Sequence, residues 1–428
     1  MVPAAEDAGS ELHGLIAKLY PICRSLTGDG VRETLAIIGR DVPLEITEVP
    51  TGTQVFDWTV PREWNIRAGW IAAPDGARVV DFRRSNLHVL GYSVPVRARL
   101  PLGELREHLF THPENPDWIP FRTSYYDENW GFCLSSRELE QLADGEYEVV
   151  IDSSLADGSL TYAESYIEGE ITDEVLFSTY VCHPSLCNDN LSGVALVAAL
   201  AKYLRSMPLR YSYRFLFGPG TMGPLCWLWK NESRLDKIAH GLVISCAGDP
   251  GSLTYKRSRR EEAEIDQAAA NVMRGAGGTV LPFEPWGGDE RQFCSPGFNL
   301  PVGALTRTPA DKFPGYHSSA DNLDLVRPEF LADSFRGVLE IVDVLETNGR
   351  YLNRNPKGEP QLGKRGLYRR VAGGSSTETA LLWVLNLSDG EHTLLDVSDR
   401  SGLPYAAIRE AAEKLVEHDL LEEEARPR

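Results

Sequence analysis

A histidine and an aspartate lie six residues apart in one polar loop, which reads CHPSLCNDNLSGVA from residue 182. His183 follows the apolar run EVLFSTYV, and Asp189 lies just before the point where the chain turns into a helical pattern at Gly193. An imidazole and a carboxylate together suit a borderline cation such as Zn²⁺. A third candidate ligand, His317, lies in the turn-rich loop PGYHSSADNL. A metal site formed by these three residues is one interpretation of the pattern.

Each residue also has an ordinary structural explanation. A histidine before a proline commonly only stabilises its loop, and an aspartate within Asn-Asp-Asn commonly forms an Asx turn or caps a helix. The residues alone leave both interpretations open.

The loops that carry these residues belong to an alternating pattern of strands and helices between residues 166 and 352. Short apolar runs such as EVLFSTYV, YRFLFGPG and GLVISCAG are separated by helical patterns such as GVALVAALAKYLR. This alternation predicts an α/β domain with a mainly parallel mixed sheet and helices on both faces. Polar loops beyond the carboxyl ends of such strands form the ligand crevice. The pattern therefore predicts a crevice formed by loops 183–190, 219–223 and 247–251.

Two other regions differ in character. Residues 46–165 consist of short alternating runs between Gly, Pro and Asp, which predicts an inserted, mostly β domain. The α/β domain is then discontinuous and covers residues 1–45 and 166–352. Residues 353–428 begin with the polar linker NRNPKGEPQLGKRG and continue as three helical segments that resemble a winged helix-turn-helix.

The charge of the chain argues against nucleic acid as a partner. The 43 basic and 62 acidic residues give a net charge of -19, and residues 391–428 alone hold five basic and ten acidic side chains. We therefore expect a small-molecule substrate, and an interaction role for the winged helix within the chain or between subunits. A homo-oligomer formed through the inserted domain or the winged helix is a further expectation.

The sequence also bears on location. No stretch reaches the roughly 20 apolar residues that span a bilayer, and the first residues lack the apolar core of a signal peptide. The seven cysteines include no CxxC pair, which predicts reduced thiols. These features favour a cytoplasmic protein that does not enter a membrane.

Several strings resemble the active-site segments of M28-like zinc aminopeptidases: CHPSLCNDNLSGVA, FLFGPGTMG, GGDERQFCSPGFNLPVG and YHSSADNL. Three further strings, TGTQVFDWTVPREWNIR, TSYYDENWGFC and QLGKRGLY, are similar to one branch of that superfamily. Members of this branch are often labelled polysaccharide-biosynthesis proteins with an aminopeptidase-like domain. They carry a β domain inserted near the N-terminus and a winged helix at the C-terminus. The resemblance covers residues 12–423.

The resemblance gives the three candidate ligands the places of the first histidine, the bridging aspartate and the last histidine of the peptidases. It also implies a cis peptide bond after Asp189. Two adjacent glutamates of the peptidases, a general base and a ligand, are replaced here by Gly220 and Thr221, and a later acidic ligand falls on Ser245. Because three clear ligands remain, we expect one Zn²⁺ rather than two, with Asp249 as a possible extra ligand.

The missing glutamates leave the proton-transferring group open, because amide hydrolysis needs a carboxylate close to the metal-bound water. Asp249, Asp289 and Glu290 are the remaining candidates, and Arg291 and Tyr316 are candidate substrate-binding residues. The alternative explanation is structural: Asp289 and Glu290 in GGDERQ lie in a solvated loop or form a salt bridge with Arg291.

We expect a zinc-dependent hydrolase or amide-transforming enzyme that acts on a small amide, an amino-acid conjugate or a modified sugar in a biosynthetic pathway. Ordinary aminopeptidase activity is not expected. The alternative is a non-hydrolytic, metal-containing binding or scaffold protein.

Two further features have functional and structural interpretations, of which the structural one is favoured. The basic segment TYKRSRR suits an anionic substrate or an exposed hairpin end. Aromatic residues of the inserted domain suit either sugar stacking or a core: Trp58, Trp64, Tyr125, Tyr126 and Trp130.

Overall fold

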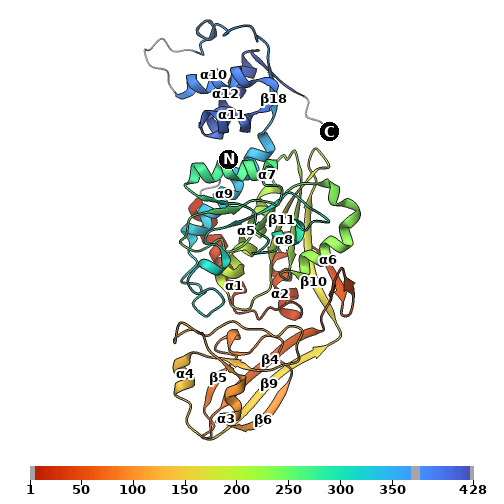
Figure 1. Ribbon diagram of the computed structural model, residues 1–428, viewed down its shortest axis with the longest axis vertical. Coiled ribbons are helices and arrows are strands. Elements are labelled where there is room, and N and C mark those ends of the chain that lie inside the picture. The colour runs from red at the N-terminus through yellow and green to blue at the C-terminus, as the bar shows by residue number, and fades with distance from the viewer. Residues whose placement is uncertain (1–4, 368–375, 425–428) are drawn as a thin grey trace.

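The computed structural model describes residues 5–367 and 376–424. Figure 1 shows three parts along the long axis of the molecule, with the inserted domain at one end, the α/β domain in the middle and the winged helix at the other end. None of the helices in these residues is long and apolar enough to cross a membrane.

The α/β domain is built on an eight-stranded sheet with the order β1-β10-β12-β11-β13-β16-β14-β15. Its strands are β1 (Glu45–Pro50), β10 (Ser159–Ile167), β11 (Glu174–Tyr180), β12 (Ser212–Gly218), β13 (Ile238–Ile244), β14 (Thr254–Lys256), β15 (Thr279–Leu281) and β16 (Val302–Thr306). The four central strands β12, β11, β13 and β16 are parallel, while β1, β10 and β14 pair antiparallel with their neighbours. Every residue of β11 and β12 is buried, as expected for strands covered on both faces.

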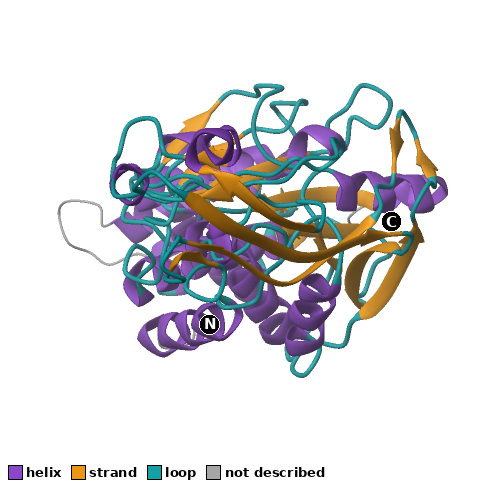
Figure 2. Ribbon diagram, turned by 90° about the horizontal axis from the view of Figure 1, so that it is seen from below, coloured by secondary structure: helices purple, strands orange, loops and turns teal. Residues whose placement is uncertain are grey.

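Helices cover both faces of this sheet, which confirms the predicted architecture (Figure 2). One face packs against α1 (Ala5–Leu19), α2 (Asp29–Ile38), α5 (Gly193–Leu204), α7 (Glu264–Ala276) and α9 (Pro328–Thr347). The other face packs against α6 (Met222–Asn231) and the short α8 (Glu290–Phe293). The alternating side chains of β11 divide between the two layers, since Phe177 joins the first apolar cluster and Leu176 the second.

The inserted domain has its own antiparallel sheet with the order β5-β4-β9-β6. Its elements are β4 (Glu63–Ala72), β5 (Arg78–Asp81), β6 (Val96–Pro101), α3 (Leu102–Leu105), β7 (Leu109–Phe110), β8 (Phe132–Cys133), α4 (Ser136–Glu140) and β9 (Glu146–Ala156). A separate apolar cluster that includes Phe132 and Val149 fills this domain. The hairpin of β2 (Gln54–Val55) and β3 (Trp58–Thr59) lies against α6 instead.

The sequence pattern placed β1 and β10 in the insertion, whereas they pair with each other in the large sheet, with Glu45 opposite Glu164. Alternating apolar and polar residues look the same in either sheet, so the pattern could not assign these two strands. The strands of the four-stranded sheet lie between Glu63 and Ala156. The insertion is thus joined to the α/β domain through two adjacent antiparallel strands.

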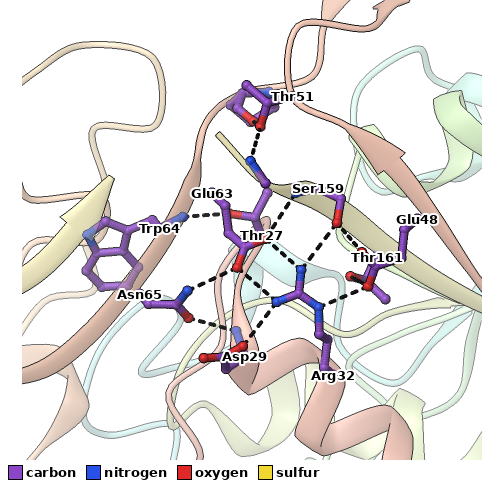
Figure 3. A network of polar contacts seen from close by, with 12 residues as sticks. Thr27, Asp29, Arg32, Glu48, Thr51, Glu63, Trp64, Asn65, Ser159 and Thr161 are labelled. Atoms are coloured by element: carbon purple, nitrogen blue, oxygen red, sulfur yellow. Dashed lines mark hydrogen bonds and ion pairs between the residues drawn. The ribbon is translucent and has the colours of Figure 1, made fainter. Parts of the chain in front are cut away.

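One arginine ties this junction together (Figure 3). Arg32 of α2 donates to both carboxylate oxygens of Glu63, at 2.9 and 2.6 Å, and to Glu48 of β1 at 3.0 Å. Glu63 begins β4, and it also accepts the main-chain N–H of Ser159, the first residue of β10. The network therefore joins a helix and two strands of the α/β domain to the first strand of the insertion.

The C-terminal part is a winged helix formed by β17 (Arg350–Asn353), α10 (Ser376–Leu387), β18 (Asp389–Thr393), α11 (Leu394–Ser401), α12 (Tyr405–Glu417) and β19 (Leu421–Glu423). Because β17 pairs with β18 and β19, this domain begins at residue 350, slightly before the predicted linker. It contacts α7 and α9 of the α/β domain. Arg274 pairs with Asp399 at 2.6 Å, and Arg409 of α12 pairs with Asp343 of α9 at 2.6 Å.

Candidate metal centre

The loop after β11 carries the first two candidate ligands at the carboxyl end of the central strands. His183 lies just beyond β11 with a positive φ of 75°, and Asp189 lies in a turn (Cys187–Ser192) whose backbone is not helical at Asp189 and which leads into α5. The peptide bond between Asp189 and Asn190 is cis, as the sequence resemblance implied. The side-chain amide of Asn190 donates to the carbonyl of Tyr180 at 3.0 Å, which attaches this turn to the end of β11.

The structure brings His183, Asp189 and His317 together. One ligand atom from each lies within 4.8 Å of the others. His317 Nε2 is 3.0 Å from Asp189 Oδ2 in an ion-pair contact, but neither of these buried atoms has a well-aligned hydrogen bond. An imidazole nitrogen and a carboxylate oxygen that lack well-aligned hydrogen bonds are available as ligand atoms for a cation.

The protonation states of these groups suit a metal. Burial lowers the pKa of His183 to about 4, so its imidazole is neutral at pH 7 and keeps a free lone pair. Burial alone would raise the pKa of Asp189, but the two histidines and the Tyr180 hydroxyl hold it below its usual value. That hydroxyl donates to Asp189 Oδ1 at 2.5 Å, which leaves Oδ2 directed toward His317. Two imidazoles and one ionised carboxylate fit a single zinc ion with an open coordination position.

A carboxylate outside the predicted set positions this loop. Asp321 is fully buried and accepts the main-chain N–H groups of Asn188 at 2.6 Å and Asp189 at 2.8 Å. Burial raises the pKa of Asp321 to about 7. In the sequence, Asp321 is visible only as an acidic residue four positions after His317 in YHSSADNL. Its role was not predicted, because its hydrogen-bond partners lie more than 130 residues away along the chain.

Asp249 is occupied by other contacts. Its carboxylate accepts hydrogen bonds from the Thr308 hydroxyl at 2.6 Å, the Gly251 N–H at 2.8 Å and the Asn188 amide at 3.1 Å. No ligand atom of Asp249 belongs to the cluster of three described above. Its contacts are those of a buried anchor for the loops around the site.

Asp289 borders the loop of Gly220 and Thr221. Its Oδ1 accepts the main-chain N–H of Thr221 at 2.7 Å, while the buried Oδ2 has no hydrogen-bond partner. Burial, opposed by the Thr221 N–H, raises the pKa of Asp289 to about 7. The neighbouring Gly220 N–H donates to the thiol of Cys182, the residue before His183, at 3.1 Å. Asp289 thus contacts the loop of Gly220 and Thr221, which is bonded to the residue before His183, and it has a free oxygen and a pKa suited to proton transfer at neutral pH.

The other predicted residues of this region have different surroundings. Glu290 is buried and pairs with Lys256 of the basic segment, and not with Arg291 as the salt-bridge alternative proposed. Arg291 lies on α8, two residues after Asp289, and its buried Nε has no hydrogen-bond partner. Tyr316 stacks on His317 with ring centroids 3.9 Å apart, and burial and nearby Asp189 raise its pKa.

The remaining basic and aromatic residues are mostly structural. Arg259 and Arg260 donate to the side chain and the main chain of Asn299. Trp64 is buried, and Trp130 stacks on His108. Trp58 and Tyr126 form an exposed pair with ring centroids 6.1 Å apart.

The inserted domain also reaches the site. Residues 119–121 run beside residues 317–319, and the Phe121 N–H donates to the His317 carbonyl at 2.7 Å. The Phe121 ring lies edge-on against the rings of His183 and His317. No sequence pattern linked this phenylalanine to the site.

Comparison with known proteins agrees with this architecture. Residues 13–348 match the family described as Domain of unknown function (DUF4910), and residues 349–423 match a winged helix-turn-helix family. A curated Clostridium acetobutylicum protein named for polysaccharide biosynthesis and an aminopeptidase-like domain is 52% identical over 97% of both chains.

Solved structures extend the comparison. A Clostridium acetobutylicum crystal structure described as that of a peptidase is 51% identical, with a TM-score of 0.94 over 98% of this chain and 97% of that chain. A zinc aminopeptidase from Bacillus subtilis has a TM-score of 0.58 at 11% identity, over 79% of this chain and 94% of that chain. The second likeness shows the aminopeptidase-like fold alone.

Proposed function

Since the chain belongs to the DUF4910 family and combines its aminopeptidase-like domain with a winged helix, we propose that it is a zinc-dependent hydrolase or amide-transforming enzyme with one metal ion. The observation that carries this proposal is the convergence of three ligand atoms within 4.8 Å, two of them buried without a well-aligned hydrogen bond. His183, Asp189 and His317 would hold the zinc ion. A bound zinc ion polarises a carbonyl oxygen and lowers the pKa of its water.

Asp289 is the proposed acid–base residue. Its Oδ1 accepts the Thr221 N–H at the position where, by the sequence resemblance, the peptidases carry their glutamates, and its Oδ2 has no hydrogen-bond partner. With a pKa near 7, it can accept a proton from an attacking water and return it to a leaving amine. The Thr221 N–H fixes the orientation of the carboxyl group through Oδ1.

The proposed substrate is a small amide, an amino-acid conjugate or a modified sugar. The name of the Clostridium acetobutylicum relative supports a role in polysaccharide biosynthesis. Arg291 and Tyr316 are proposed to contact the substrate, because one lies beside the acid–base candidate and the other stacks on a ligand histidine. The net charge of -19 supports a small substrate rather than nucleic acid.

Metal analysis of the purified full chain tests the proposal. We expect one zinc ion per chain in the wild type and loss of zinc in His183→Ala and His317→Ala. His418→Ala, in the winged helix, is the matched control and should keep its zinc. Zinc content that is equal in all four proteins would refute the metal site.

Hydrolysis of a panel of N-acyl amines, aminoacyl amides and N-acetylated sugars then separates an enzyme from a scaffold. Asp289→Asn should retain zinc but lose turnover. Turnover that persists in Asp289→Asn would remove this residue from the mechanism. A zinc-loaded wild type that turns over no member of the panel would instead favour the non-hydrolytic scaffold.

A further inference from the structure

The inserted domain is attached to the loop of one candidate ligand by main-chain hydrogen bonds. The Phe121 N–H donates to the His317 carbonyl at 2.7 Å, and the Ser319 N–H donates to the Ile119 carbonyl at 2.8 Å. The Ile119 N–H donates in turn to the Ser319 hydroxyl at 3.0 Å, and Pro120 forms a bridge with Ser318. A side chain on this segment is therefore held in a fixed position relative to His317.

Phe121 occupies that position, and its ring forms a triangle with the two histidine rings. Its centroid lies 5.0 Å from that of His183 and 5.1 Å from that of His317, at interplanar angles of 74° and 81°. The two imidazole centroids are 5.2 Å apart. These edge-to-face contacts are favourable for aromatic rings and fill the space beside the imidazoles with apolar atoms.

A second aromatic residue of the insertion lies near the end of the strand that leads to His183. Tyr125 packs edge-on against Tyr92 at 5.6 Å, and burial together with nearby Cys182 raises its pKa well above the usual value. The phenol is thus neutral and close to the residue that precedes His183. Beyond it, the chain reaches the exposed pair of Tyr126 and Trp58, so the loop runs from the candidate ligands out to the surface.

We propose that Phe121 is a specificity-determining residue that limits the size of the substrate group next to the metal. This inference rests on the proposed function and adds a size limit on the acyl part of the amide. The physical reason is steric: the ring is fixed by its main chain, and the two imidazoles lie against its edge. A bulky acyl substituent on this side would have to displace the ring.

Two metal-binding probes of different size test this proposal without a known substrate. Acetohydroxamate and benzohydroxamate present the same chelating group with a methyl or a phenyl substituent. Their affinities for the zinc-loaded full chain are measured by isothermal titration calorimetry in the wild type, Phe121→Ala, Phe121→Leu and the control Phe110→Ala. Phe110 lies on β7 of the same domain, and its ring contacts Arg122.

We expect the wild type to prefer acetohydroxamate. Phe121→Ala should bind benzohydroxamate about tenfold more tightly, with acetohydroxamate changed less than about threefold, because a changed pocket wall discriminates by this order. Phe121→Leu should lie between, and Phe110→Ala should match the wild type. If Phe121→Ala does not fold, Phe121→Leu carries the same comparison.

The outcomes separate the inference from the proposed function. Zinc-loaded variants whose ratio of the two affinities equals that of the wild type would overturn the role of Phe121 and leave the metal site intact. An equal loss of affinity for both probes would also overturn it, because that is the effect of a merely structural residue. A wild-type chain that binds no zinc would overturn both.

Discussion

Replacing Asp321 with asparagine should weaken both the fold and the metal site. The buried Asp321 carboxylate accepts two main-chain N–H groups, from Asn188 at Oδ1 and Asp189 at Oδ2. An asparagine keeps one acceptor oxygen but turns an NH₂ group toward the other N–H. One buried donor then loses its partner and faces a second donor. A buried unsatisfied group costs roughly 1–3 kcal/mol, and the repulsion adds to this cost, so we expect the free energy of unfolding to fall by about 3 kcal/mol.

The same substitution should reduce zinc affinity, because the peptide that shifts carries Asp189. Groups that orient a metal ligand through hydrogen bonds typically contribute about 10- to 100-fold to metal affinity. Asp324→Asn is the control, since Asp324 is exposed and lies three residues away on the same loop. A surface change of this kind should alter stability by less than about 0.5 kcal/mol.

Urea unfolding of the zinc-free protein and zinc competition with a chromophoric chelator measure the two effects separately. The expected result is a lower midpoint with an unchanged slope for Asp321→Asn, together with weaker zinc binding. If Asp321→Asn unfolds at the same urea concentration as Asp324→Asn and binds zinc as tightly as the wild type, the hydrogen bonds of Asp321 do not support the site.

Three further predictions concern other parts of the chain. Asp289 has a folded pKa of about 7, above its unfolded value, so the folded state holds its proton more tightly and the free energy of unfolding should fall as pH rises from about 4 to 7. Asp289→Asn should flatten this part of the plot of urea midpoint against pH, and a slope identical to that of the wild type would contradict the prediction. Arg32 holds the pKa of Glu63 near 2, so this pair should stabilise the fold above about pH 4.5 and lose its effect as pH falls toward 2. The Arg32→Met variant should therefore unfold at a higher pH than the wild type on acid titration, and an unchanged acid midpoint would exclude this role. Arg409→Ala should remove the ion pair with Asp343 and speed hydrogen exchange in α12, and unaltered exchange would mean that other contacts dock the winged helix.

Local patterns were sufficient for the central parallel strands of the α/β domain, though not for β1 and β10, and for placing the first two candidate ligands in one loop. His183 and Asp189 lie at the end of an apolar strand, where the crevice of a parallel sheet is expected, and the structure brings their ligand atoms together with that of His317. The prediction that these residues bind zinc remains to be tested. The winged helix was predicted from the spacing of apolar residues in its three helical segments, and the family comparison confirms this prediction.

Residues whose roles depend on distant partners were not visible in the sequence. Phe121 and Asp321 act through contacts with segments far along the chain, which no local period encodes. Glu290 is paired by Lys256 from another strand, although its sequence neighbour Arg291 offered a simpler partner. Asp249 shows the same limitation, because only the folded chain places Thr308 and Asn188 around its carboxylate.

The junction through β1 and β10 has a consequence for how the chain folds. Pairing of these strands closes residues 51–158 into one loop, which costs about 4 kcal/mol of chain entropy if that loop is unstructured. When β4 and β9 pair first, with Glu63 opposite Ala156, the open chain shrinks to two short connections and the cost falls to about 2 kcal/mol. The inserted domain, with an apolar cluster of its own, can therefore form first and bring β1 and β10 together in register before they join the large sheet beside β12.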